Sequence, residues 1–187
     1  MKDNLIFIGM PAVGKSTVGI VVAKRLGKRF IDTDLLIQEQ EKKLLREIIA
    51  EVGDQGFLEI ENQVNRDVKA ENSVISPGGS VIYCEEAMKH YKEIGTVVYL
   101  KASYQTIKRR IRNPQKRGVV LREGQTLKGL YDERVPYFEK YADITVCEDG
   151  CRIEETIENV INAVRAYGKN GGNTGRKRRG RRYAPKK

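Results

Sequence analysis

The sequence predicts an α/β fold in three layers, with a five-stranded parallel sheet between two layers of helices. Short apolar runs alternate along the chain with longer segments of helical periodicity, which is the pattern of repeated strand–helix units. The runs Val74–Ile75 and Val97–Leu100 are continuously apolar. Continuous runs are expected of strands buried on both faces, and such strands form parallel sheets covered by helices.

Five strands and seven helices follow from these patterns. The expected strands are Leu5–Ile8, Phe30–Asp32, Ser73–Ser76, Thr96–Leu100 and Asp143–Val146. The expected helices lie near residues 15–26, 35–52, 54–71, 85–93, 103–111, 126–140 and 153–167. The segment 112–124 is rich in arginine, glycine and proline, and its length as a loop is typical of a mobile lid.

The composition favours one soluble globular domain, which we place at residues 1–167. The chain has 187 residues, of which 40% are hydrophobic and 32% charged, enough for a stable core. No apolar run approaches the ~20 residues that span a bilayer. Met1–Asn4 leads directly into the first expected strand without the pattern of a signal peptide. We therefore expect a cytoplasmic protein without a membrane partner, and a monomer.

The positive charge is concentrated at the carboxyl end. Residues 168–187 hold nine lysines and arginines and no acidic residue, so a net charge of +10 leaves only +1 for residues 1–167. The glycine- and asparagine-rich composition of this tail predicts disorder. Two interpretations stay open: a weak electrostatic arm for RNA, DNA or another polyanion, and a solvated tail without a partner.

The three cysteines, Cys84, Cys147 and Cys151, do not form a disulfide framework by number or spacing. His90 is the only histidine and is far from all of them in sequence, so a zinc site lacks ligands. We expect free thiols.

A glycine-rich loop follows the first expected strand. Residues Gly9–Ser16 read GMPAVGKS, which matches G-x-x-x-x-G-K-[ST] between a strand and a helix. Its N–H groups can surround phosphate oxygens at the positive end of the helix dipole. Lys15 can reach the β- and γ-phosphates, and Ser16 can offer its hydroxyl to Mg²⁺. An ordinary strand-to-helix turn would not explain the Lys-Ser pair. The expected nucleotide contacts are Gly9, Ala12, Val13, Gly14, Lys15, Ser16 and Thr17.

Two carboxylates end the second expected strand. Asp32 and Asp34 are two residues apart, so both point toward the crevice where α/β proteins bind ligands. One can hold Mg²⁺ through water, and the other can accept a proton from an attacking hydroxyl. In the alternative interpretation Asp34 only caps a helix that begins at Leu35.

At this point the chain resembles the shikimate kinase family, over residues 4 to about 165. The resemblance rests on the order of GMPAVGKS at 9–16, DTD at 32–34, GFLEIE at 56–61 and SPGGS at 76–80. A basic lid segment ending at Lys116-Arg117 follows, and then ERVPYFEKYAD at 133–143. The resemblance implies a P-loop kinase fold with a mobile lid at 112–124 and a substrate-covering region at 35–71. It also implies transfer of the γ-phosphate of ATP, with Mg²⁺, to a hydroxyl of shikimate.

The resemblance assigns roles to individual residues. Lys15, Asp34 and Arg117 match the catalytic phosphate-loop lysine, the base that also holds the substrate hydroxyls, and the lid arginine that closes over the phosphoryl group. Ser16 and Asp32 match the metal-binding pair. The remaining matches are Gly78 and Gly79 against the substrate ring, Arg134 on the substrate carboxylate, Glu61 in the substrate site, and Arg110 on adenine. For Arg110, a solvated helix end is the alternative.

The acceptor side departs from the family pattern at Leu58, where an arginine would pair with the shikimate carboxylate. A charge-assisted pair contributes about 1.5–3 kcal/mol, so its loss corresponds to roughly 10- to 150-fold in affinity. Glu61 would lose its usual partner, Ser80 replaces a third glycine, and Arg117–Val120 replaces R-P-L-L. Three functions stay open: a shikimate kinase, a kinase of another small hydroxyl compound that lacks the carboxylate, and a non-catalytic nucleotide-binding protein with an RNA-binding tail.

Overall fold

A five-stranded, all-parallel sheet forms the centre of the molecule, as the apolar runs predict. The computed structural model describes residues 3–111 and 124–169. The strands stand in the order β2-β3-β1-β4-β5. They are β1 (Asn4–Ile8), β2 (Arg29–Asp32), β3 (Ser73–Ser76), β4 (Gly95–Lys101) and β5 (Ile144–Cys147). Each neighbouring pair is parallel, so the carboxyl ends of all five strands lie at one edge.

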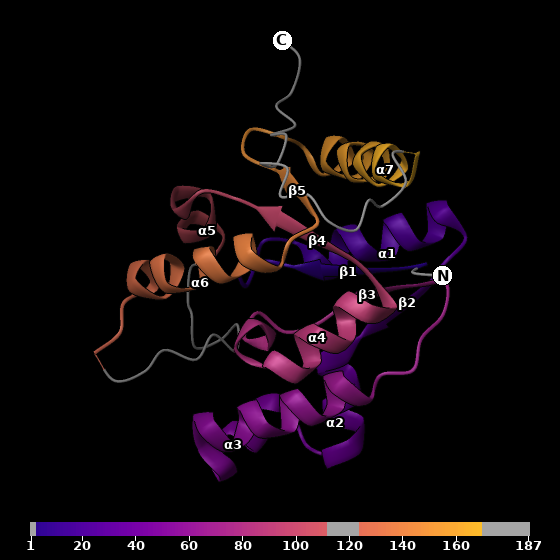
Figure 1. The fold of residues 1–187 in the computed structure, drawn as a ribbon. Helices are drawn as coiled ribbons and strands as arrows, with labels where there is room; N and C mark the ends of the chain where they lie inside the picture. The colour runs from indigo at the N-terminus through magenta and orange to yellow at the C-terminus, as the bar shows by residue number, and fades with distance from the viewer. Residues whose placement is uncertain (1–2, 112–123, 170–187) are drawn as a thin grey trace.

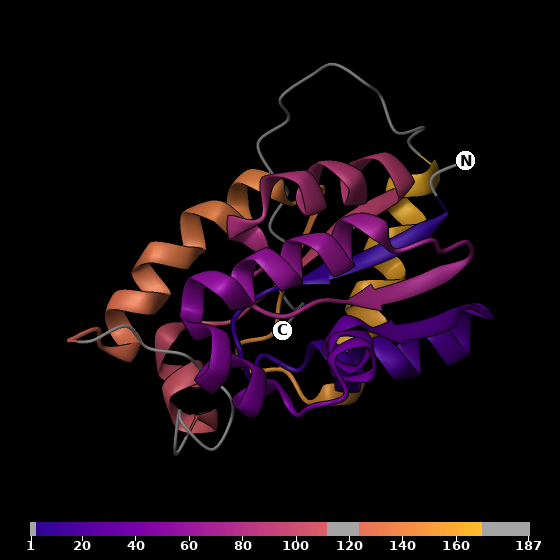
Figure 2. The same ribbon diagram turned by 90° about the horizontal axis from the view of Figure 1, so that it is seen from below.

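Helices cover both faces of the sheet and complete three layers (Figure 1). They are α1 (Lys15–Leu26), α2 (Thr33–Glu41), α3 (Leu45–Asp67), α4 (Glu85–Ile94), α5 (Tyr104–Arg110), α6 (Leu127–Tyr141) and α7 (Ile153–Lys169), with a 3-10 turn η1 (Val81–Tyr83). In Figure 1, α1 and α7 lie above the strands and α4 below them. Figure 2, the view from below, has α4 in front of the strands and α7 behind. Within the described ranges, no helix is long and apolar enough to cross a membrane.

The main core lies on both faces of the sheet. Every residue of β1 and β3 is buried, which explains why their apolar runs do not alternate. On β4, the Tyr99 ring stacks on Phe138 of α6 with centroids 5.2 Å apart. This contact fixes α6 over the sheet.

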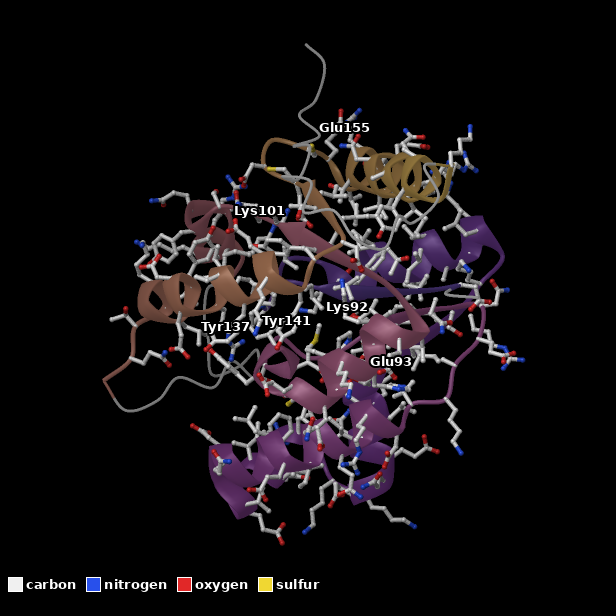
Figure 3. All side chains as sticks on the ribbon, viewed as in Figure 1. Lys92, Glu93, Lys101, Tyr137, Tyr141 and Glu155 are labelled. Atoms are coloured by element: carbon white, nitrogen blue, oxygen red, sulfur yellow. The ribbon has the colours of Figure 1, made fainter. Side chains whose placement is uncertain are left out.

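A lysine on α4 joins that helix to the turn between α6 and β5. The Lys92 ammonium donates to the Tyr141 carbonyl at 3.2 Å and forms an ion pair with Asp143. Lys92 and Tyr141 are labelled in Figure 3, where they lie near each other between the two helices. The Asp143 carboxylate also accepts from the Val97 amide at 2.9 Å. The turn is thereby held against β4.

The helices of region 35–71 differ from the prediction. The expected helix 35–52 ends instead at Glu41, where Lys42 takes a left-handed conformation with φ 54°. A new helix then runs from Leu45 to Asp67, and the expected break near residue 53 is only a kink at Gly53, with φ 70°. The reversal at Lys42 brings α2 and α3 together over a second, smaller core of Ile37, Ile48, Phe57 and Val64. This long-range packing decides the helix boundaries.

Two predicted segments fall largely outside the described residues. The lid at 112–124 is described only at Gly124, and the tail at 168–187 only at Gly168 and Lys169. Helix α7 includes these two tail residues, so it continues past the predicted domain end at 167. The free state of all three cysteines is confirmed.

The close approach of β4 to β1 at Gly95 can be tested by substitution. A Cβ atom there would lie 2.6 Å from the Asn4 carbonyl oxygen and 2.4 Å from Ile6 Cδ1. We expect Gly95→Ala to lower the free energy of unfolding by about 1–3 kcal/mol, because overpacking forces the strands apart. Urea denaturation measures this. Gly168→Ala is the matched control, since a Cβ atom there would meet no described atom within 4 Å. Equal stability of both variants would contradict the argument.

Candidate active site

The phosphate-loop motif forms a tight turn between β1 and α1. Gly9 has φ 151°, and a Cβ atom there would lie 2.6 Å from the Leu100 carbonyl oxygen, so only glycine fits. Gly14, with φ 107°, precedes the first residue of α1. Among the residues that the structure describes, no side chain caps this helix, so its first N–H groups are available to a ligand. The turn therefore offers the helix N-terminus to an anion, as the sequence predicts.

Lys15 lies inside this turn. Its ammonium donates to the carbonyl oxygens of Gly9 at 3.1 Å and Met10 at 3.4 Å. Burial lowers the pKa of Lys15 to about 8, although the nearby Asp34 carboxylate opposes that shift. A half-buried ammonium that donates to two neutral carbonyls is well placed to bind phosphate oxygens.

Asp32 joins the phosphate loop to the second strand. Its Oδ2 accepts from the Ser16 hydroxyl at 2.9 Å, and its Oδ1 accepts from the Asp34 amide at 3.1 Å. Asp32 is thus the cap of α2, which begins at Thr33, and the interpretation of Asp34 as the cap is wrong. One hydroxyl and one carboxylate fit Mg²⁺, which is usually held by few protein oxygens together with phosphates and water.

The six predicted acceptor contacts line one pocket, and they come from four regions of the chain. They are Asp34, Leu58, Glu61, Gly78, Gly79 and Arg134. The pocket lies beside Pro11 of the phosphate loop. The sequence analysis missed Tyr83, whose ring lies 5.4 Å from the Arg134 guanidinium carbon and whose hydroxyl donates to Glu133 at 2.6 Å. No sequence signal marks Tyr83, because the fold alone brings η1 to α6.

The two glycines of SPGGS leave room for the ligand. A Cβ atom on Gly78 would lie 2.5 Å from Glu61 Oε1 and 3.0 Å from Asp34 Oδ1. On Gly79 it would lie 3.0 Å from the Arg134 Nη1 atom. The backbone at these positions therefore packs directly against the charged groups of the pocket.

Two of the pocket carboxyls have raised pKa values. The pKa of Asp34 is raised to about 6, by burial and by the neighbouring Asp32 carboxylate, while Lys15 opposes the shift. The pKa of Glu61 is raised to about 7, mainly by burial; the nearby Ser80 hydroxyl lowers it in part. A carboxylate with a pKa near 6 is matched to proton transfer at neutral pH, so Asp34 suits the role of a base.

Glu61 has an unusual environment for a carboxyl group. The residue is 0% exposed, and neither oxygen has a hydrogen-bond partner within 3.5 Å among the described residues. Leu58, one helical turn earlier, is half-buried against the main core. No cationic side chain therefore stands where the resemblance places an arginine.

Arg110 braces the phosphate loop and is not a solvated helix end. Its guanidinium donates to the Val13 carbonyl at 2.8 Å and forms an ion pair of 2.5 Å with Glu148. Glu148 is 3% exposed, and the sequence analysis did not single it out. These contacts hold α5 and the end of β5 against the phosphate loop. The contact of Arg110 with adenine stays a prediction.

Arg117 lies outside the described residues.

Comparison with known proteins agrees with this geometry. The family model described as shikimate kinase matches residues 11–165. The shikimate kinase of Clostridium botulinum is 36% identical over 171 residues, which cover 89% of this chain and 97% of that protein. The solved shikimate kinase of Aquifex aeolicus matches with a TM-score of 0.78 at 29% identity, over 90% of this chain and 99% of that one. A structure from Acinetobacter baumannii, described as shikimate kinase in complex with shikimate, has a TM-score of 0.80 over 88% of this chain and 93% of its own; at 24% identity it supports the fold.

The buried Glu61 carboxyl predicts a pH-dependent stability. Its pKa rises from 4.5 to about 7 on folding, so the native state binds the proton more tightly and stability falls between these pH values. Above pH 7 the ionised form costs about 3 kcal/mol. We expect Glu61→Gln to recover much of this at pH 8 and little at pH 4.5, measured by urea unfolding.

The matched control is Glu59→Gln, an exposed glutamate on the same helix. It should leave the stability difference between pH 4.5 and pH 8 as in the unmodified protein. A Glu61→Gln protein with the same pH dependence as the unmodified chain would contradict the assignment.

Proposed function

The chain belongs to the shikimate kinase family, and from this premise we propose that it transfers the γ-phosphate of ATP to a hydroxyl of shikimate, giving shikimate 3-phosphate and ADP. The observation that carries the proposal is the junction of two sites at Asp34. This carboxylate lines the acceptor pocket and also interacts electrostatically with Lys15 of the phosphate loop. Donor and acceptor would meet between these two side chains.

In this proposal each charged residue has one task. Asp34 accepts the proton of the attacking hydroxyl as the oxygen–phosphorus bond forms. Lys15 stabilises the negative charge that develops on the transferring group, where a preorganised cation is most effective. Arg134, 7% exposed, binds the acceptor carboxylate. Ser16 and Asp32 would hold Mg²⁺, which when bound supplies charge neutralisation and alignment of the phosphates.

A second candidate acceptor is a neutral hydroxyl compound without the carboxylate. Leu58 favours this neutral acceptor, because an apolar side chain on the pocket wall offers neither a charge nor a hydrogen bond to a carboxylate. The chemistry at Lys15 and Asp34 would be unchanged.

Turnover of shikimate and of its neutral methyl ester separates these candidates. We expect Mg²⁺-dependent release of ADP with formation of phosphorylated shikimate, measured by a coupled assay and mass spectrometry. Lys15→Ala should lower kcat at least about 100-fold, and Asp34→Asn about 100- to 10,000-fold. The exposed Lys89→Ala on α4 is the matched control and should retain full activity. Full turnover by Lys15→Ala would disprove the mechanism, and a higher kcat/KM for the ester would favour the second candidate.

We further propose that the protein acts in the cytoplasm as a monomer and that the basic tail makes weak contacts with polyanions. The polyanion contact is supported by the nine lysines and arginines of residues 168–187, a segment without acidic residues. Removal of residues 168–187 should abolish retention on heparin at low salt while leaving kcat unchanged. Retention that survives this truncation would assign the binding to the kinase domain.

A further inference from the structure

The acceptor pocket has an excess of acidic side chains. Among its described lining residues, Arg134 is the only cationic group, and Asp34, Asp54 and Glu61 are acidic. Within this described lining, an acceptor that carries a carboxylate shares one guanidinium with carboxylates of the protein. The balance of charge depends on whether those carboxyls are ionised.

Glu61 is the carboxyl that the fold isolates most completely. It is 0% exposed and has no hydrogen-bond partner among the described residues, yet it lines the pocket. Its Oε1 atom lies 2.5 Å from the point where a Cβ atom on Gly78 would stand. A buried, unpaired carboxylate is costly, and a proton removes that cost.

Charged and titratable groups face Glu61 from several packed elements. The Asp34 carboxylate on α2 favours the protonated form, whereas Arg134 on α6 and Lys15 on α1 favour the ionised form. Cys84 and Tyr91, at the start and near the end of α4, also face it, and the pKa values of both are raised. They are therefore neutral at physiological pH. Arg134 and Lys15 are also the groups to which the proposed function assigns ligand binding.

Leu58 leaves Glu61 without a basic neighbour one helical turn earlier on α3. The two residues are three apart on α3, and both line the pocket. Side chains three apart on a helix are neighbours, so a basic residue at 58 would pair with Glu61. Leucine cannot, and it packs against the main core instead.

We propose that the protonation state of Glu61 determines acceptor specificity. The protonated side chain allows an anionic acceptor to bind, and the ionised side chain repels it. Because Leu58 cannot pair with Glu61, the pH of the solution sets which form is present. The inference rests on the proposed function, because it takes a carboxylated hydroxyl compound as the acceptor. The affinity for a neutral acceptor would not depend on the charge of Glu61.

The test is equilibrium binding of shikimate and of methyl shikimate to the full-length protein, without nucleotide, by calorimetry at pH 6.0 and 8.5. A carboxylic acid of ordinary pKa is ionised at both pH values. If only the protonated Glu61 form binds, the Kd of shikimate should rise about 30-fold between them, given a pKa of about 7. The Kd of the neutral ester should change less than about threefold. Since both ligands meet the same Asp34, the ester corrects for its titration.

Three variants make the test specific. Glu61→Gln should make the Kd of shikimate nearly independent of pH, and the exposed Glu59→Gln should keep the 30-fold rise. Leu58→Arg should lower the Kd at pH 8.5 and flatten the pH dependence, because the new guanidinium pairs with Glu61.

Two results would overturn the proposal: a Kd for shikimate with the same pH dependence in Glu61→Gln as in the unmodified protein, or an equal rise for the ester. In either case shikimate could still be phosphorylated, so the proposed function would stand. If shikimate does not bind even at pH 6.0, both the proposal and shikimate as the acceptor fail. If shikimate binds as expected but is not phosphorylated with ATP and Mg²⁺, only the proposed function fails.

Discussion

The Asp32 carboxylate holds the two halves of the candidate site together. One oxygen accepts from the Ser16 hydroxyl at the start of α1, and the other accepts from the Asp34 amide at the start of α2. The first bond fixes the end of β2 beside the phosphate loop. The second begins the helix that carries Asp34 toward the acceptor pocket. Because β1, β3 and β2 are parallel neighbours, all these groups meet at one edge of the sheet.

Close packing in the pocket accounts for its electrostatics. Gly78 brings its backbone against Glu61 and Asp34, and space for even one methyl group is lacking. Desolvation then raises the pKa values of both carboxyls, and their distinct surroundings separate them. An ionised Glu61 without a partner lowers the free energy of unfolding. Such a loss of stability is common where a binding site requires buried polar groups.

The elements that were predicted correctly are those whose signals are local. The limits of α1 follow from the glycine loop before Lys15 and from Gly27 after Leu26, and the structure has the same limits. The break between α2 and α3 was predicted at the wrong place, because Lys42 adopts a left-handed conformation that no residue type there indicates. The second core of Ile37, Ile48, Phe57 and Val64 stabilises that reversal, and it joins residues up to 27 positions apart.

The parallel sheet, the phosphate loop and the Asp32–Asp34 pair follow from local patterns in the sequence, because periodicity and the spacing of nearby residues indicate the direction of side chains. The six acceptor contacts follow instead from the resemblance to a known family, and the structure brings all six to one pocket. Three features depend on tertiary packing: Glu61 is buried with no hydrogen-bond partner among the described residues, Arg110 pairs with Glu148, and Tyr83 lies against Arg134. Desolvation and charge pairing depend on which distant segments exclude water from a group. Arg110 and Glu148 are 38 residues apart in the sequence, and Gly78 and Arg134 lie 17 and 73 residues from Glu61, which they face.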